Sequence, residues 1–350
     1  DAKAHTHTHA HTDAHADELV FFAPGLRCVM FPDNGRTVFK GYLFAGNVLL
    51  NESGMQNHPL TPMTDANLVR VMQAQTRRKV GLIDYKTVAQ GESAIQQRIA
   101  DLRAEGVGVA VVDATSNDDL HRLGPALKGM PLVTAGSGVA IGLPANFGLQ
   151  PSLQASQLPT ASGLQAVVSG SCSVATNAQV AHFKATGRPT WAIHPASLMH
   201  GQTDAVVQQV LAWAAPLLAQ GPVLVYSTAE PEAVKQVQAQ LGVAEAGAMV
   251  EHALAAVARG LVQLGVQQLV VAGGETSGAC VQALGIAQLQ IGPQIDPGVP
   301  WCHAPARISA TGGAGAGAGA GAGKGGVHIA LKSGNFGTED FFTKAFTVLR

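Results

Sequence analysis

The chain has 350 residues, of which 47% are hydrophobic and 13% are charged. This composition indicates a packed globular protein with room for two domains, and it excludes a disordered one. The 22 basic and 23 acidic residues give a formal net charge of -1, so there is no basic footprint for nucleic acid or for an anionic membrane. No apolar run reaches the ~18 residues of a membrane-spanning helix. We therefore expect a cytoplasmic protein whose partner is a small molecule.

The four cysteines are scattered and form no C-x-x-C pair, which argues against a structural zinc site and against a disulfide scaffold. The first 17 residues contain five histidines. Imidazole clusters can capture a transition metal, but an untethered, solvated tail is the alternative. We expect residues 1–30 to form a His-rich, disordered start, followed by the first folded domain over residues 31–150.

From Val20 onward the composition becomes that of a folded protein, and short apolar runs alternate with amphipathic segments, which is typical of a parallel α/β sheet. In the first half, residues 107–113 (VGVAVVD) and 132–134 predict strands, and a helix is expected to begin near Ser116. Residues 143–162 are rich in Pro, Gln and Ser and predict a domain boundary. The second domain is then expected over residues 160–350.

In this second half, the pattern predicts strands at residues 166–168, 222–226, 268–272 and 327–332, and helices at 174–186, 231–241, 246–264 and 277–284. Such alternation predicts a doubly wound, mostly parallel sheet that binds its ligand at the carboxyl ends of the strands. The Ala/Gly-rich run at 312–326 (GGAGAGAGAGAGKGG) lacks the spacing of a phosphate-binding P-loop. It also leads into a strand instead of opening a helix, so we expect a flexible surface loop.

Three turns rich in Gly and Ser follow predicted strands in the second half. They span residues 169–173 (SGSCS), 273–277 (GGETS) and 332–337 (KSGNFG). Small residues let the backbone approach a phosphate, and a helix N-terminus offers unpaired N–H groups and a positive dipole end. If the three turns share one sheet edge, they predict an anion pocket.

Four further features leave two interpretations each. Glu275 is either a helix-capping carboxylate or a ligand of Mg²⁺, which takes one or two carboxylates plus phosphate oxygens. Lys332 is either a solvated surface lysine or a phosphate clamp. Residues 52–63 (ESGMQNHPLTPM) form a polar loop that suits a polyhydroxy acid, or an ordinary connection. Arg36 is either a bidentate partner of a substrate carboxylate or a surface charge.

Taken together, these motifs resemble the four-carbon acid sugar kinases. The resemblance begins near Phe31 and runs to the C-terminus in the order NGRTVFKGYLFAGNVLLNESGMQNHPLTPMTDANLVR, VVDA, LVTAGSG, VSGSCSVATNAQV, VAGGETSGACVQALG, IDPGVPWC and LKSGNFGTEDFF. The Glu of GGET and the PGVPW segment at 297–301 favour the branch of the family that phosphorylates 3-oxo-tetronate over the threonate and erythronate branches.

The resemblance implies an N-terminal substrate domain, a C-terminal nucleotide domain and transfer of phosphate from ATP to a terminal hydroxyl, giving 3-oxo-tetronate 4-phosphate. It implies ATP and Mg²⁺ as cofactors, Glu275 as the metal ligand and an acid sugar as partner, and it leaves a homo-oligomer open. The acid sugar is expected to be bound by Arg36 and by His58 and Thr61 of the HPLTPM loop. No catalytic base is identified. The expected nucleotide-binding residues are Ser171, Ser173, Gly273, Gly274, Glu275, Thr276, Ser277, Gly334, Asn335 and Gly337.

One departure from the family pattern concerns the start of the chain. Family members open with a strand and an acidic ADDFTGA-type turn, which residues 1–30 do not contain. We therefore expect an incomplete N-terminal substrate domain. A catalytically impaired remnant that binds nucleotide or acid is the alternative function, and a metal-binding protein built on the His-rich start is a third hypothesis. A nicotinamide enzyme is disfavoured, because no G-x-G-x-x-G stands between a strand and a helix.

Overall fold

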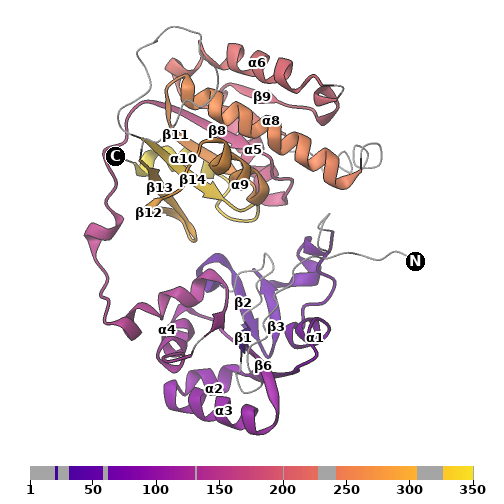
Figure 1. The fold of residues 1–350 in the computed structure, drawn as a ribbon, viewed down its shortest axis with the longest axis vertical. Coiled ribbons are helices and arrows are strands. Elements are labelled where there is room, and N and C mark those ends of the chain that lie inside the picture. Colours follow the sequence, from indigo (N-terminus) through magenta and orange to yellow (C-terminus); the bar gives the residue numbers. More distant parts are fainter. Residues whose placement is uncertain are drawn as a thin grey trace. The chain divides into compact units, whose positions relative to one another are not determined.

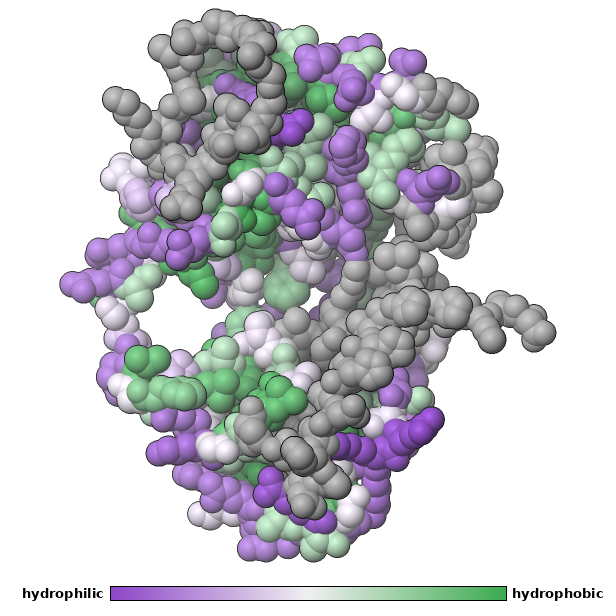
Figure 2. All heavy atoms as spheres, viewed as in Figure 1, coloured by the Kyte–Doolittle hydropathy of each residue, from purple (hydrophilic) through white to green (hydrophobic). Residues whose placement is uncertain are grey.

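The computed structural model describes residues 20–22, 31–57, 62–130, 132–199, 201–227, 242–305 and 326–349. The chain divides into two compact α/β units, Asp1–Gln150 and Pro151–Arg350 (Figure 1). Hydrophilic and hydrophobic residues are interspersed over the visible face of each unit (Figure 2). None of the helices in the described ranges is both long and apolar enough to cross a bilayer.

The first unit is built on a parallel sheet with the strand order β5-β6-β1-β7. These strands are Lys79–Ile83 (β5), Val107–Val112 (β6), Val20–Phe22 (β1) and Val133–Thr134 (β7). The helices of this unit are Leu68–Gln73 (α1), Tyr85–Ala89 (α2), Glu92–Ala104 (α3) and Asn117–Ala126 (α4). The helix expected near Ser116 is α4, and Ser116 caps it by accepting a hydrogen bond from the N–H of Asp119.

The structure differs from the sequence prediction at the start of the chain. Residues 20–22 form β1, which pairs in parallel with both β6 and β7. The prediction of a disordered start over residues 1–30 overlooked the run LVFF at 19–22, whose apolar and β-branched residues favour a strand. The His-rich residues 1–17 lie outside the described residues.

A small antiparallel sheet sits beside the parallel one in this unit and contains Arg36–Phe39 (β2), Tyr42–Ala45 (β3) and Val48–Leu49 (β4). Its anchor is Asp113, which is fully buried at the end of β6. The Asp113 carboxylate accepts hydrogen bonds from the N–H groups of Lys40 at 2.7 Å, Gly41 at 2.8 Å and Tyr85 at 2.9 Å. Asp113 therefore ties the β2–β3 turn and the start of α2 to the parallel sheet.

The second unit contains a seven-stranded sheet with the order β12-β13-β14-β11-β8-β10-β9. β8, β9, β10, β11 and β14 are parallel, and β12 and β13 pair antiparallel at one edge. The strands are Leu164–Ser169 (β8), Thr190–Ala192 (β9), Val223–Tyr226 (β10), Val266–Ala272 (β11), Gln290–Asp296 (β12), Val299–Ala304 (β13) and Val327–Lys332 (β14). The prediction of a mostly parallel sheet is confirmed.

Helices cover both faces of this sheet (Figure 1). One buried cluster joins alternate strand residues to α5 (Val174–Ala185) and α10 (Phe341–Val348). The other joins the remaining strand residues to α6 (Thr203–Ala214), α8 (Val243–Gln263) and α9 (Gly274–Ala283). Neighbouring strands β8 and β11 lead into helices on opposite faces, so their carboxyl ends form the topological switch point at which ligands bind in such folds.

The predicted strands of the second half are confirmed in position, with differences of a few residues at their ends. The helix predicted at 277–284 begins earlier, at Gly274, because Gly273 has a φ of +120° and turns the chain into the helix directly after β11. Glu275, Thr276 and Ser277 are consequently in the first turn of α9. The helix predicted at 231–241 and residues 312–325 of the Ala/Gly-rich run lie outside the described residues.

Candidate functional site

The three Gly/Ser-rich turns begin side by side at the carboxyl edge of the second sheet. Ser169, Ala272 and Lys332 end β8, β11 and β14 and lie in register across these strands. Beyond them, the N–H of Gly170 donates to the carbonyl of Ala272 at 2.9 Å, and the N–H of Gly273 donates to that of Lys332 at 2.8 Å. The turns thus continue the sheet before they separate.

Two glycines allow the turns to pack against one another. A Cβ at Gly334 would lie 2.5 Å from the Ser171 Oγ. A Cβ at Gly273 would lie 2.8 Å from the Thr276 Oγ1 and 3.2 Å from the Ser171 nitrogen. No side chain fits at either position without movement of a neighbour. At Gly274, by contrast, a Cβ would meet nothing within 4 Å, so the backbone at the N-terminus of α9 faces open space.

The carbonyl oxygen of Gly334 is the centre of the hydrogen bonds between the first and third turns. It accepts from the Ser173 Oγ at 2.6 Å, the Thr176 Oγ1 at 2.8 Å and the Lys332 Nζ at 3.0 Å. Ser173 also caps α5, since its Oγ accepts from the N–H of Thr176 at 3.2 Å. The N-terminus of α5 is therefore fixed directly against the loop that leaves β14.

Lys332 is fully buried, which contradicts both sequence interpretations of this residue. Its Nζ donates to the Thr176 Oγ1 at 3.0 Å and to the carbonyls of Ser333 at 3.1 Å, Gly334 at 3.0 Å and Phe336 at 3.1 Å. Burial lowers its pKa to about 7. Lys332 is neither a solvated surface charge nor a clamp that reaches a ligand, because its ammonium group is enclosed by its own loop.

The first turn of α9 contains the predicted metal ligand. Glu275 is partly buried there, Thr276 is buried, and the Ser277 Oγ is buried with no hydrogen-bond partner in the described part of the chain. Within the described ranges, no three His, Cys, Asp or Glu side chains cluster in a way that could hold a metal. A magnesium ion at this site would therefore have Glu275 as its carboxylate and would take its other ligands from phosphate and water.

The structure brings the predicted nucleotide-binding residues together at this one edge, where they come from the turns after β8, β11 and β14. The serine hydroxyls of the first turn already have partners within it: Ser171 Oγ lies 3.3 Å from Ser173 Oγ and accepts from the Ser173 N–H at 3.3 Å. The groups that remain for a ligand are backbone N–H groups, the open face of Gly274 and the hydroxyl of Ser277, which is unpaired among the described residues.

In the first unit, Arg36 is the first residue of β2. Val38 of the same strand forms a β-bridge with Ala114, so β2 runs close to the segment that leads into α4. The Arg36 Nη1 is buried and has no hydrogen-bond partner among the described residues. The Oδ1 of Asn117 is buried and unpaired as well, while its Nδ2 donates to the Asp33 Oδ2 at 2.5 Å. An unpaired guanidinium N–H is a donor suited to a carboxylate.

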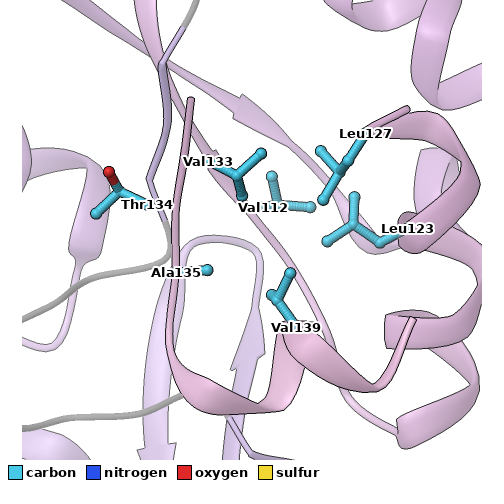
Figure 3. Close-up of a pocket in the computed structure, with 7 residues that line it drawn as sticks. All are labelled: Val112, Leu123, Leu127, Val133, Thr134, Ala135 and Val139. Atoms are coloured by element: carbon cyan, nitrogen blue, oxygen red, sulfur yellow. The ribbon is translucent and has the colours of Figure 1, made fainter. Parts of the chain in front are cut away.

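The other two predicted substrate-binding residues, His58 and Thr61, lie outside the described residues. A small hollow in the first unit does not supply a substitute. It is lined by the apolar side chains of β6, α4 and the segment after β7, and Thr134 points its hydroxyl away from the others (Figure 3). Its lining residues are Val112, Leu123, Leu127, Val133, Thr134, Ala135 and Val139. Such a surface does not suit a polyhydroxy acid.

Sequence reasoning missed three residues that organise these sites: Asp113, Thr176 and Gln179. Asp113 had a signal, because a carboxylate directly after a buried strand lies at the ligand edge of the sheet. Thr176 and Gln179 had a weaker one, as polar residues on the buried face of α5. Both are fully buried, and their hydrogen bonds to the loop after β14 span more than 150 residues of sequence, a pairing that no local pattern reveals.

Comparison with protein-family models gives two matches. A sugar-binding N-terminal domain matches residues 1–143, and a nucleotide-binding C-terminal domain matches residues 166–342. The first match begins at residue 1, so the expectation of an incomplete N-terminal substrate domain is not supported. The second match spans all three turns at the sheet edge.

Several curated bacterial proteins are similar to most of the chain. A 3-oxo-tetronate kinase from Pseudomonas fluorescens is 53% identical over 323 residues, which cover 91% of this chain and 70% of the relative. One from Burkholderia multivorans is 52% identical over 341 residues, covering 95% of this chain and 75% of the relative. A solved structure from Salmonella typhimurium covers 94% of this chain and 73% of its own, with a TM-score of 0.70 and 38% identity. A solved structure from Haemophilus influenzae covers 95% of this chain and 74% of its own, with a TM-score of 0.60 and 40% identity.

Proposed function

The chain belongs to the four-carbon acid sugar kinase family and is a kinase with an alcohol acceptor, and we propose that it phosphorylates 3-oxo-tetronate with ATP. The products are 3-oxo-tetronate 4-phosphate and ADP. The γ-phosphoryl group passes to the 4-hydroxyl oxygen, and the hydroxyl proton is released. The names of the relatives support this choice of substrate.

One observation carries the nucleotide half of the proposal: three glycine-containing turns interlock at the carboxyl ends of β8, β11 and β14. Two helices, α5 and α9, begin at this edge. Phosphoryl transfer asks the protein mainly for positioning and for stabilisation of charge. Helix N-termini and backbone N–H groups supply both without a side chain that must be desolvated.

Mg²⁺ is the second cofactor of the proposal. Glu275 is the proposed ligand, and its position in the first turn of α9, next to Gly274, supports this choice. Bound Mg²⁺ supplies positive charge on the phosphate oxygens of ATP. A single carboxylate suits this ion, since it commonly binds through one or two carboxylates and substrate phosphates.

In the substrate half, Arg36 is the proposed partner of the acid-sugar carboxylate. Its Nη1 is a buried donor that lacks an acceptor in the described structure, and an unpaired buried donor is costly unless a ligand satisfies it. The Oδ1 of Asn117 is an unpaired acceptor, and it suits a sugar hydroxyl. His58 and Thr61 are proposed to complete this site.

The alternative of a catalytically impaired remnant is not favoured. Relatives named as kinases retain 50–53% identity over at least nine-tenths of this chain. The sugar-binding model also matches from residue 1.

The proposal is tested by measuring ADP release from Mg·ATP with 3-oxo-tetronate, threonate and erythronate as separate acceptors. We expect turnover that requires both Mg²⁺ and 3-oxo-tetronate, with slower reaction of the other two acids. In parallel, Mg·ATP at a hundred times its dissociation constant should stabilise the chain by about 2.7 kcal/mol. Nucleotide-dependent stabilisation without turnover of any acid would instead support the remnant, and absence of both would overturn the proposal.

A further inference from the structure

The loop after β14 has an unusual arrangement of its carbonyl groups. The carbonyls of Ser333, Gly334 and Phe336 all accept hydrogen bonds from the Lys332 Nζ, at 3.0–3.1 Å. Three carbonyls of a four-residue stretch therefore converge on one amino group in the interior of the unit. A protonated lysine has three N–H donors, and it shares them among these carbonyls and the Thr176 hydroxyl.

Gln179 of α5 continues the same arrangement along the loop. Its Nε2 shares two N–H donors among the carbonyls of Phe336 at 3.0 Å, Gly337 at 3.1 Å and Thr338 at 3.0 Å. Gln179 is fully buried, as Lys332 is. Between them, the two side chains hold five of the six carbonyls of residues 333–338, and all five point toward the interior.

Inward carbonyls determine where the amide N–H groups point. In a planar trans peptide, the C=O of one residue and the N–H of the next are antiparallel. The inward carbonyls of Ser333 and Phe336 therefore turn the N–H groups of Gly334 and Gly337 away from the interior. Neither of these N–H groups donates a hydrogen bond within the described residues.

The next N–H in the series already binds a carboxylate of the unit itself. The N–H of Thr338 points opposite to the carbonyl of Gly337 and donates to Asp296, which is buried, at 2.8 Å. The peptide groups of this loop thus present donors to negative charge, and Gly334 lies beside the open N-terminus of α9, since Gly334 packs on Ser171, which packs on Gly273. Gly337 follows three residues later, against Gln179 and Phe341.

We propose that Lys332 and Gln179 are positioning residues that turn these peptide groups outward, so that the N–H groups of Gly334 and Gly337 bind phosphate oxygens of the nucleotide. The inference rests on the proposed function. Both side chains act without touching the nucleotide, because both are enclosed by protein. Successive outward N–H groups form an anion-binding concavity, and here its shape depends on a buried cation and a buried amide behind the backbone.

The test separates phosphate recognition from the rest of nucleotide binding. Binding of Mg·ATP, inorganic tripolyphosphate and adenosine to the whole chain is measured by calorimetry. The variants are Lys332→Met and Gln179→Met, which replace the donors with apolar side chains of similar length. Lys184→Met is the matched control, because Lys184 lies near the opposite end of α5.

In both variants we expect affinity for Mg·ATP and tripolyphosphate to fall about tenfold or more, as loss of charge-assisted hydrogen bonds predicts. Adenosine affinity should change less than about twofold, and Lys184→Met should match the wild type. A variant that merely loosens the unit would weaken adenosine and tripolyphosphate together. If Lys332→Met does not fold cooperatively, Gln179→Met carries the test.

Two outcomes contradict different statements. Wild-type affinity for tripolyphosphate in both folded variants overturns the inference and leaves the proposed function intact. Failure of the wild-type chain to bind either Mg·ATP or tripolyphosphate overturns the proposed function itself. A second readout is the pH profile: tripolyphosphate affinity of the wild type should fall as pH rises through about 7, where Lys332 loses its proton, and that of Lys332→Met should lack this step.

Discussion

Replacement of Asp113 by Asn sets two physical effects against each other in the first unit. Burial raises the pKa of Asp113, so the charged carboxylate is strained by desolvation and an uncharged amide should relieve this strain. The hydrogen bonds at this site, by contrast, favour the carboxylate over the amide. One carboxylate oxygen accepts the N–H groups of Lys40 and Tyr85, and the other accepts the N–H of Gly41, so only acceptors fit.

The geometry indicates that the loss of hydrogen bonds lowers the free energy of unfolding by more than the relief of desolvation raises it. An Asn side chain can keep its oxygen toward two of the N–H groups, but its NH₂ then faces the third, a donor against a donor. A hydrogen bond to a charged group contributes about 1.5–3 kcal/mol, and a buried donor left unpaired costs about 1–3 kcal/mol. Relief of desolvation offsets part of this loss. We expect Asp113→Asn to destabilise the first unit by about 2–3 kcal/mol.

The assay uses the distribution of tryptophans. All three, Trp191, Trp213 and Trp301, lie in the second unit, so their fluorescence reports unfolding of that unit, whereas circular dichroism reports both. In urea, Asp113→Asn should lower the midpoint seen by circular dichroism and leave the tryptophan midpoint unchanged. The control, Asp101→Asn on the exposed face of α3, should change stability by less than about 0.5 kcal/mol.

An Asp113→Asn variant as stable as the wild type would refute this reasoning and show that desolvation dominates. The pH dependence gives an independent check. A carboxyl group whose folded-state pKa is raised above 3.8 binds more protons when folded, so its contribution to stability is present below that value and is lost as pH rises above it. The asparagine variant should lack this fall.

Four more outcomes are expected. Gly274→Leu should abolish Mg·ATP binding without loss of stability, and Gly274→Ala should bind nearly normally, because no atom lies within 4 Å of the added Cβ. The pKa of Lys332 is lowered from 10.5 to about 7, so the free energy of unfolding should rise from pH 7 toward pH 10 by up to about 1.4 kcal/mol per pH unit. In urea titrations, Lys332→Met should flatten this rise. Burial and the neighbouring His303 lower the pKa of His328, so stability should be lost as pH falls below 6.5, and His328→Gln should reduce that loss. Arg36→Lys should raise the KM for 3-oxo-tetronate at least about tenfold and leave the KM for ATP nearly unchanged. An equal rise in the two KM values would contradict the proposed role of Arg36.

The second unit was largely predictable from sequence. Each buried strand is a continuous apolar run, such as VLVY in β10 or QLVVA at the end of β11, and a glycine-rich turn follows the strands of the ligand edge. These signals are local, because burial on both faces of a parallel sheet determines the composition of the strand itself. The position of the three turns at one edge follows from that topology.

Side-chain roles were not predictable in the same way. The letters KSGNFG do not tell whether the lysine points into solvent or into the protein. That is decided by Thr176 and the loop carbonyls, which surround its Nζ. The start of α9 at Gly274 depends likewise on a backbone angle at Gly273 that glycine permits but does not require. The strand at residues 20–22 was not predicted, although the composition of a folded protein begins at Val20, because this strand is only three residues long.

Two of the motifs that carry the family resemblance are far apart in sequence but hydrogen-bonded to one another or to the helix that follows. In IDPGVPWC, Asp296 accepts hydrogen bonds from the Thr338 N–H at 2.8 Å and the Lys344 Nζ at 2.5 Å, and Trp301 donates to the carbonyl of Ala345 at 2.8 Å. Both therefore brace the segment LKSGNFGTEDFF and α10 behind it. The PGVPW segment, which favoured one substrate branch in the sequence, thus lies behind the loop after β14 and, through Trp301, supports α10. Discrimination among acid sugars is then expected from the first unit, where Arg36 and Asn117 keep unpaired buried atoms.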